Sequence, residues 1–429
     1  MKKLLALMLA VVMVVCFAAC KPAATVDPVD DQNNVNPVDD QTPDNTDDAN
    51  TPDNTDASAL KIGVILIGDE NEGYTYAHIE GITSAAKELG IADDQIIWKY
   101  TIPEDAICTE TALDLADQGC TLIVSNSYGH QSFMEEAAKQ VPDVQFVSMT
   151  GDGAAKSGLD NFANAFTYVY ESRYVSGVVA GMKLAELVAD NKLTEANYDG
   201  ENIKIGYVGA YPYAEVVSGY TAFYLGIKSI VPNVVMDVTY TNSWFDIINE
   251  GAAAEALMAR GCVIIGQHAD STGAPSAVQA ALEKGTVAYS VGYNVDMLSV
   301  APQAALTSAT NNWGVYYKYL FSAMMNGEDV ATDWAAGYNE GAVAITTLGE
   351  SCAEGTAEKV AEVEKAIHDG TLHVFDTATF TVGGETLTSY DKSYGFEGNE
   401  LISDGYFHES ELRSAPAFDI RIDGITELS

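Results

Sequence analysis

Basic residues are scarce in this sequence. Its 429 residues include 21 Lys and Arg against 62 Asp and Glu, which gives a formal net charge of −41. A surface with that charge repels phosphate backbones and anionic lipid headgroups. The charge therefore argues against nucleic acid as a partner and against docking through a basic patch. It identifies no ligand by itself.

Long apolar runs and closely spaced cysteines are also missing. Beyond residue 20, no run is long and apolar enough for a membrane-spanning helix. Four of the six cysteines follow Cys20, namely Cys108, Cys120, Cys262 and Cys352, and no C-x-x-C pair occurs. Two cysteines 12 residues apart at opposite ends of one helix, such as Cys108 and Cys120, stand about 18 Å apart and do not bridge. We expect these four thiols to be buried. A disulfide between another pair of them remains an alternative.

The first twenty residues are typical of an export signal. Lys2 and Lys3 precede an apolar stretch at 4–15, and Phe-Ala-Ala at 17–19 precedes Cys20. This resembles a lipobox, in which the cysteine becomes the lipid-modified N-terminus. An ordinary cleaved signal peptide is the alternative. We predict a signal peptide over 1–20 and a lipid anchor at Cys20 on the extracytoplasmic face of the cell membrane.

Residues 21–59 carry no apolar periodicity. Pro-Val-Asp-Asp-Gln occurs at 28–32 and again at 37–41, and Thr-Pro-Asp-Asn-Thr-Asp occurs at 42–47 and again at 51–56. A segment with so few apolar residues and so many like charges cannot offset the entropy lost on ordering. We predict a disordered acidic tether.

From residue 60 onward, short apolar segments alternate with amphipathic ones. The first series has strand-like segments at 61–67, 96–100, 121–125 and 144–148, with helix-like segments at 76–89, 104–117 and 132–140 between them. The second series has strand-like segments at 203–208, 234–240, 262–266 and 287–291, and helix-like segments at 170–187, 216–229, 249–260 and 274–284. Apolar strands separated by helices are typical of parallel sheets.

This alternation predicts an α/β fold of two lobes joined by a hinge. Each lobe is a doubly wound parallel sheet, as in type I periplasmic binding proteins. We expect lobe 1 over 60–167 and lobe 2 over 168–291. Residues 292–429 then return to both lobes, contribute to three hinge crossovers, and end in short strands and loops after a helix at 354–369.

Polar and aromatic residues follow most of the predicted strands. In open α/β sheets, ligands bind at the carboxyl ends of the strands, so these loops face the expected cleft. Aromatic faces suit stacking on a flat heterocycle, and carboxylates and amides suit its polar groups. Asp residues after strands also serve as helix caps or turn formers. The candidate ligand-binding residues in these loops are Asp69, Tyr74, Ser127, Trp244, Asp246, His268, Asp270, Asn294 and Asp296.

The order of these motifs resembles the basic membrane protein family of lipoproteins, which is similar to the purine nucleoside receptor A proteins. Residues 63–81 look like the opening of the family, and 170–181 match its helix motif Y-x-x-R-Y-L-A-G-x-x-A-G. Ser-Trp-Phe-Asp at 243–246 matches a family turn, and the stretches at 266–271 and 306–308 align in order. The resemblance runs from residue 61 to the C-terminus.

The resemblance implies an extracytoplasmic solute-binding protein of an ABC importer that captures a purine nucleoside or base. In the family, two aromatic rings sandwich the base, and the matching positions are Tyr74 and Trp244. Acidic residues bind the ribose, and their turn matches Asn294 and Asp296, with Asn294 replacing an Asp. Asn311 lies near a position where many members have a Lys. The implied partners are the small ligand, an ABC permease and the membrane, with no cofactor or metal.

Three other functions are alternatives to this one. An enzyme is one, but no nucleophile elbow, phosphate-binding Gly loop or metal-binding His pair is present. His78 and His268 are the residues that such an enzyme would use as bases. The same fold also serves ligand sensors, and it also binds sugars or autoinducers. The sequence does not distinguish a sensor, or a sugar- or autoinducer-binding protein, from a purine-binding protein.

Replacing Cys20 with Ser tests the predicted anchor. Without the thiol that carries the lipid, we expect the protein to move from the membrane fraction to the soluble extracytoplasmic fraction. Fractionation and immunoblotting measure this, with Cys16→Ser as the matched control that keeps the protein on the membrane. A Cys20→Ser protein that stays membrane-bound contradicts lipidation at this residue.

Overall fold

A computed structural model describes residues 60–428 of the chain. The signal peptide, Cys20 and the acidic tether predicted above lie outside the described residues. Within 60–428, no helix has the length and apolarity needed to cross a membrane. The four cysteines in this range are free thiols, and Cys108, Cys120 and Cys262 are buried as expected, whereas Cys352 is only partly buried.

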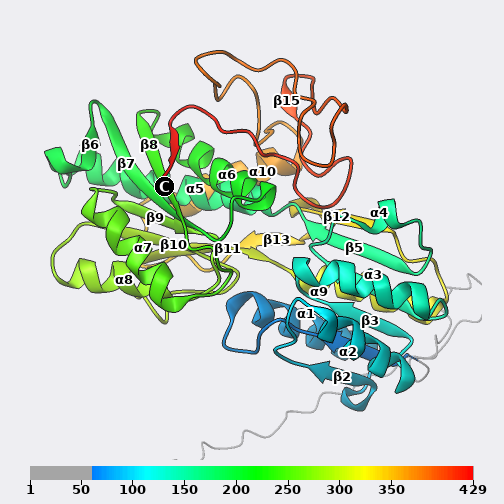
Figure 1. Cartoon of the computed structure of the whole chain (residues 1–429). Coiled ribbons are helices and arrows are strands. Elements are labelled where there is room, and N and C mark those ends of the chain that lie inside the picture. The colour runs from blue at the N-terminus through cyan, green and yellow to red at the C-terminus, as the bar shows by residue number, and fades with distance from the viewer. Residues whose placement is uncertain (1–59, 429) are drawn as a thin grey trace, which may run out of the picture. The chain divides into compact units, whose positions relative to one another are not determined.

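The first sheet has six parallel strands in the order β12-β5-β4-β3-β1-β2 (Figure 1). We call this sheet and the helices packed on it lobe 1. Its strands are β1 (Ile62–Ile65), β2 (Ile96–Lys99), β3 (Leu122–Ser125), β4 (Gln145–Met149), β5 (Phe162–Thr167) and β12 (Asp333–Ala336). Its helices are α1 (Gly73–Leu89), α2 (Ala106–Asp117), α3 (Gln131–Gln140), α4 (Ala154–Ser157) and α9 (Trp313–Asn326).

The second sheet has the path β13-β11-β10-β9-β7-β8-β16, and we call it and its helices lobe 2. Strand β13 is antiparallel to β11, and the other neighbours on this path are parallel. Its strands are β7 (Asn202–Gly209), β8 (Val234–Tyr240), β9 (Ile264–Gln267), β10 (Tyr289–Tyr293), β11 (Ala305–Asn311), β13 (Val343–Ile345) and β16 (Ile425–Glu427), with β6 (Tyr198–Asp199) paired to β7. Its helices are α5 (Val169–Ala189), α6 (Ala214–Ile230), α7 (Ile247–Ala259), α8 (Gly273–Glu283) and α10 (Thr356–His368).

Both sheets are wound in the same way. In the spatial orders β2-β1-β3-β4-β5 and β8-β7-β9-β10-β11, the chain starts at the second strand, adds the next strand on one side, and then adds the remaining strands on the other side. This single reversal is the doubly wound arrangement. Alternate residues of β1 point to opposite faces, so Val64 packs with α1 and α9 while Ile65 packs with α2 and α3. Both faces of each sheet are therefore covered, as the predicted α/β fold requires.

Three crossovers connect the lobes, and they are hydrogen-bonded to one another. They lie between β5 and α5, between β11 and α9, and between β12 and β13. The amide of Tyr168 donates to the carbonyl of Ala336 at 2.7 Å, and that of Asn312 donates to Ala342 at 2.8 Å. These bonds hold the three crossover segments together at the hinge.

The structure confirms the predicted strands and helices to within a few residues. For example, the helix expected at 76–89 is α1, which ends where Gly90 takes a φ of 73°. Seven elements were not expected from the sequence, namely α4, β5, α9 and β12 of lobe 1 and β6, β11 and β13 of lobe 2. Strands β5 and β12 complete the far side of the lobe 1 sheet, and β11 and β13 complete one side of the lobe 2 sheet.

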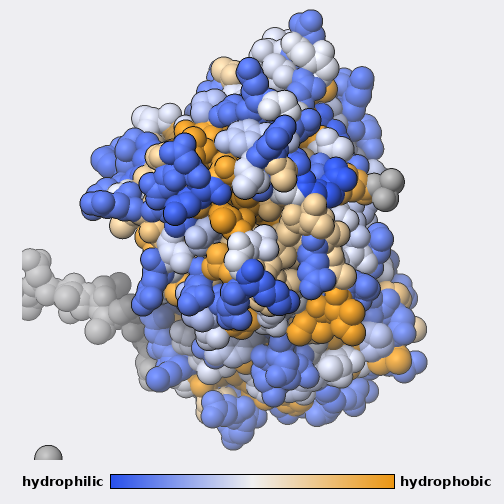
Figure 2. All heavy atoms as spheres, turned by 90° about the vertical axis from the view of Figure 1, so that its left-hand side faces the viewer, coloured by the Kyte–Doolittle hydropathy of each residue, from blue (hydrophilic) through white to orange (hydrophobic). Residues whose placement is uncertain are grey.

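The chain from residue 375 contains β14 (Ile402–Ser403), β15 (Tyr406–Phe407) and β16, and is otherwise irregular. Figure 1 shows it in orange to red beside α10 and α6. Its apolar residues join the core of lobe 2, with Phe375 and Phe418 stacked at 4.2 Å between ring centroids. The molecular face in Figure 2 is mostly hydrophilic, with apolar residues in small groups, as the acidic composition leads one to expect.

The small residues of α5 permit an unusually close contact with α6. A Cβ added to Gly226 would lie 2.1 Å from the carbonyl oxygen of Tyr174, and one added to Gly177 would lie 2.2 Å from that of Phe223. Both neighbours are helix backbone and cannot rotate away. The Gly-rich face of 170–181 therefore sets the distance between these two helices.

Gly226→Ala should destabilise the protein because its methyl group would force the two helices apart. We expect a loss of about 2–3 kcal/mol in the free energy of unfolding. Gly251→Ala in α7 is the matched control, since its Cβ would meet nothing closer than 3.4 Å, and removing glycine from a helix favours folding by roughly 0.5–1 kcal/mol. Thermal unfolding measures both, and equal melting temperatures would contradict this packing.

Candidate functional site

A cavity lies where the carboxyl ends of the two sheets meet. Residues of both lobes line it, and it is partly open to solvent. Each lining residue ends a strand or follows one closely, which is where ligands bind in open α/β sheets. The lining residues are Ile67, Glu72, Tyr74, Ser127, Tyr128, Thr150, Glu215, Trp244, Asp270 and Tyr293.

Four aromatic rings line this cavity, two from each lobe. Tyr74 is held by its hydroxyl, which donates to the carbonyl of Asn126. Trp244 packs edge-on against Tyr211, with ring centroids 5.2 Å apart. The other two rings are Tyr128 and Tyr293. Flat apolar faces from opposite lobes suit a flat ligand that both lobes contact.

Three carboxyl groups line the same cavity. Burial raises the pKa of Asp270 well above its ordinary range, and the nearby charges of Glu72, Glu250 and Glu215 raise it further. Burial also raises the pKa of Glu72, and raises that of Glu215 to about 7. Arg173 opposes the shift at Glu215 and Asp270. These groups can accept hydrogen bonds when ionised and donate them when protonated.

Arg173 and His268 lie behind the cavity wall and support it. The guanidinium of Arg173 lies 3.6 Å from the ring centroid of Tyr293, and its Nη1 donates to the carbonyl of Gln267 at 2.6 Å. His268 is fully buried, with Nε2 3.2 Å from Oε1 of Glu215. Burial, with the charge of Arg173, lowers the pKa of His268 well below its usual value. The imidazole is therefore neutral and positions Glu215.

Asn294 and Asn311 connect the cavity to the hinge. The Nδ2 of Asn294 donates to Oδ1 of Asp270 at 3.0 Å. The Nδ2 of Asn311 donates to Oδ1 of Asn294, also at 3.0 Å. The Oδ1 of Asn311 accepts from the hydroxyl of Thr167 at 2.5 Å. A lining carboxyl is thus linked through two amides to the first crossover.

The structure brings four of the ten predicted ligand-binding residues to the cavity, namely Tyr74, Ser127, Trp244 and Asp270. The remaining six do not line it. His268, Asn294 and Asn311 form the supporting contacts just described, and the other three shape the backbone. Asp69 accepts from the amide of Asn71, Asp246 caps the first turn of α7, and Asp296 accepts from the amide of Leu298. Asn294, Asp296 and Asn311 also border a separate open hollow beside α1 and α9.

Six lining residues were absent from the predicted set. They are Ile67, Glu72, Tyr128, Thr150, Glu215 and Tyr293. Glu72, Tyr128 and Tyr293 lie in the same loops as predicted residues, so the loops were found from the sequence but other side chains in them were chosen. Ile67 and Thr150 closely follow β1 and β4. The sequence signal was weakest for Glu215, which lies six residues beyond the end of β7 in the first turn of α6.

The chain belongs to the PnrA-like family of ABC transporter substrate-binding proteins, whose family model matches residues 59–374. These are extracytoplasmic binding proteins of importers and not enzymes. Among the described residues, no group of three or more His, Cys, Asp or Glu is arranged to hold a metal ion. The family model confirms the resemblance inferred from the motifs, but the match ends at residue 374 and does not reach the C-terminus as predicted.

Two curated relatives are similar to this chain over about three quarters of its length. A purine-binding protein of Brucella abortus (strain 2308) is 32% identical over 74% of this chain and 83% of its own. A Haloferax volcanii protein, TsgA13, described as a candidate glucose-binding protein of an ABC transporter, is 27% identical over 76% of this chain and 77% of its own.

Solved structures confirm the fold. A solute-binding protein of an ABC transporter system from Aeropyrum pernix K1 aligns with a TM-score of 0.60 at 17% identity, covering 76% of this chain and 94% of its own. A protein from Conexibacter woesei DSM 14684 of the same description aligns with a TM-score of 0.56 at 18% identity, covering 73% and 98%. Both support the type I periplasmic-binding-protein-like arrangement.

The raised pKa of Glu215 predicts a pH-dependent stability. A carboxyl whose pKa is 4.5 unfolded and about 7 folded stabilises the folded state most below pH 4.5. That contribution is lost as the pH rises through 7, and it amounts to at most about 3 kcal/mol. Glu215→Gln should therefore flatten the fall in melting temperature between pH 5 and pH 8. Glu255→Gln, at an exposed site on α7, should leave the profile unchanged. Identical profiles for all three proteins would contradict the burial of Glu215.

Proposed function

We propose that the protein captures a purine, as free base or nucleoside, for an ABC importer. In this proposal the ring system lies between Tyr74 of lobe 1 and Trp244 of lobe 2. The observation that carries it is that rings from both lobes line one cavity together with three carboxyl groups. A heterocycle with N–H groups on its edge satisfies both features at once.

The composition of the cavity wall narrows the ligand class. Glu72, Glu215 and Asp270 accept hydrogen bonds from ring N–H and amino groups, or from ribose hydroxyls. No Lys or Arg is among the ten lining residues, and Arg173 lies behind Tyr293. A phosphate would meet acidic groups without a compensating cation, so nucleotides are disfavoured. The purine-binding relative supports the same ligand class.

The importer assignment completes the proposal. Closure of the two lobes on the ligand would present a new combined surface to the permease, and ligand favours closure by binding that state more tightly. The lipid at Cys20 would keep the protein near the permease, with residues 21–59 as the tether. The acidic surface has no bearing on this step beyond solubility.

Calorimetric titration with adenine, hypoxanthine, adenosine, inosine and glucose tests the ligand class. We expect binding of at least one purine and none of glucose. The ratio of the affinities for adenine and adenosine then separates base from nucleoside. Glucose binding without purine binding would overturn the proposal in favour of a sugar-binding protein.

Ring removal tests the stacking geometry. Trp244→Ala and Tyr74→Ala should each weaken purine binding at least about tenfold, because stacking contributes roughly 1–3 kcal/mol per base. Tyr74→Phe should keep most of the affinity, since it retains the ring. Phe245→Ala is the matched control, because Phe245 neighbours Trp244 but is 42% exposed and does not line the cavity. Unchanged affinity in both Ala variants would reject the sandwich.

A further inference from the structure

The C-terminal segment, residues 375–428, lies beyond the part of the chain that the family model matches. Its fold depends on lobe 2. Phe380, Phe407 and Phe418 belong to the same core cluster as α5 and α6. Strand β16 extends the lobe 2 sheet by pairing with β8. The segment therefore moves with lobe 2.

Buried polar contacts fix the segment further. Glu409 is 3% exposed and accepts from the hydroxyl of Ser218 on α6 at 2.5 Å. Its other oxygen accepts from the amides of Ala417 and Phe418, at 2.9 and 2.8 Å. The turn that contains Arg413 is thus held in place from both ends. Glu409 is the polar centre of that turn.

From this turn, Arg413 reaches across to lobe 1. Its Nη1 lies 3.4 Å from Oδ2 of Asp152, and the two side chains are only 10% and 18% exposed. The guanidinium also lies 4.1 Å from the ring centroid of Phe396, in its own segment. Asp333 of β12 is near enough for the charge of Arg413 to oppose the rise in its pKa that burial causes. One arginine of lobe 2 therefore faces two acids of lobe 1.

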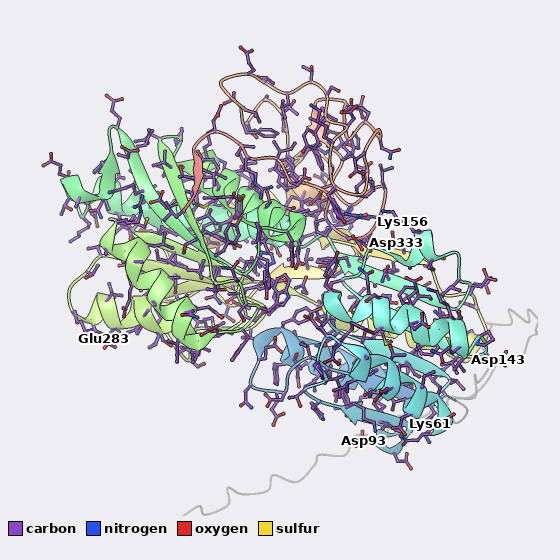
Figure 3. All side chains as sticks on the ribbon, viewed as in Figure 1. Lys61, Asp93, Asp143, Lys156, Glu283 and Asp333 are labelled. Atoms are coloured by element: carbon purple, nitrogen blue, oxygen red, sulfur yellow. The ribbon has the colours of Figure 1, made fainter. Side chains whose placement is uncertain are left out.

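Other contacts of the segment lie in the same region. Lys156 on α4 donates to the carbonyl of Gly395 at 3.4 Å. Figure 3 labels Lys156 and Asp333 close together, on the side of lobe 1 nearest the C-terminal segment. Ala415 packs in a small cluster with Phe166 of β5 and with Tyr293, which lines the cavity. The contact between Arg413 and Asp152 thus joins the lobes close to the cavity, although Arg413 does not line the cavity.

We propose that residues 375–428 form a latch between the lobes, in which Arg413 is a positioning residue for ligand binding. Opening the lobes would separate Arg413 from Asp152 and break the ion pair between them. The latch therefore favours the closed state, and the apparent affinity for ligand rises with the fraction of protein that is closed. The latch depends on the proposed function only for the choice of adenine as the ligand in its test.

The affinity for adenine tests the latch in the full-length protein. Arg413→Met should weaken adenine binding about three- to tenfold, because the partly buried ion pair no longer stabilises closure. Asp152→Asn, made on the other lobe, should have a similar effect, and the double variant should be no worse than either single one. Arg421→Met is the matched control, since Arg421 pairs with Glu427 inside the same segment.

Hydrogen exchange of the ligand-free protein tests the latch independently of the ligand. Tyr128 of lobe 1, which lines the cavity, contacts Tyr213 of lobe 2, with ring centroids 6.2 Å apart. In Arg413→Met, we expect faster amide exchange around these residues, at 125–130 and 211–216, as well as near residue 413. If wild type does not bind adenine but exchange increases as expected, the purine proposal fails and the latch stands.

Two results would overturn the latch. One is an adenine affinity within twofold of wild type in both Arg413→Met and Asp152→Asn. The other is faster exchange confined to residues 395–415, which would indicate only a local structural role. Arg413→Lys guards against a folding defect, because it keeps the charge and should show a smaller effect than Arg413→Met.

Discussion

The hydrogen bonds among the three crossovers are the constraint on which the site depends. Tyr168 to Ala336 and Asn312 to Ala342 are backbone bonds, so they do not depend on which side chains line the cavity. They hold the ends of β5, β11 and β12 together, and every other lining loop is placed by the parallel pairing of its strand. The two lobes can rotate about these short segments, but their carboxyl ends always face the same space. Function in this fold is therefore set by the side chains of the loops.

Those side chains make the cavity acidic. Three carboxyl groups share it. Burial raises the pKa of both Asp270 and Glu215, and the charges of nearby carboxyl groups raise that of Asp270 further. The positive charge of Arg173 lies behind the ring of Tyr293, which lines the cavity. A ligand that donates hydrogen bonds relieves this repulsion, whereas an anion would add to it. Selection of the ligand thus follows from charge as much as from ring shape.

Much of the fold could be predicted from sequence because its strands are short apolar runs separated by helices. Strand β5, Phe-Ala-Asn-Ala-Phe-Thr, could not, since its small and polar residues become a strand only by pairing with β4 and β12. The rule that ligands bind at the carboxyl ends of parallel strands found Tyr74, Ser127, Trp244 and Asp270. It did so because a parallel sheet brings all carboxyl ends to one edge. It could not tell that Asn294 and Asn311 point sideways to each other, or that Glu215 turns inward from a helix. Side-chain direction at strand ends depends on packing between elements far apart in the chain.

The chain of contacts from Asp270 through Asn294 and Asn311 to Thr167 has a fixed polarity. Each amide gives its NH₂ toward the carboxyl and receives a hydrogen at its oxygen from the side of the crossover. Flipping either amide would set oxygen against oxygen or NH₂ against NH₂, so the row can be arranged in one sense only while Asp270 accepts. Whatever occupies the cavity and competes for Asp270 therefore acts on a row of dipoles that ends at the hinge. The hinge is thus coupled electrostatically, through this row of hydrogen bonds, to any ligand that binds Asp270.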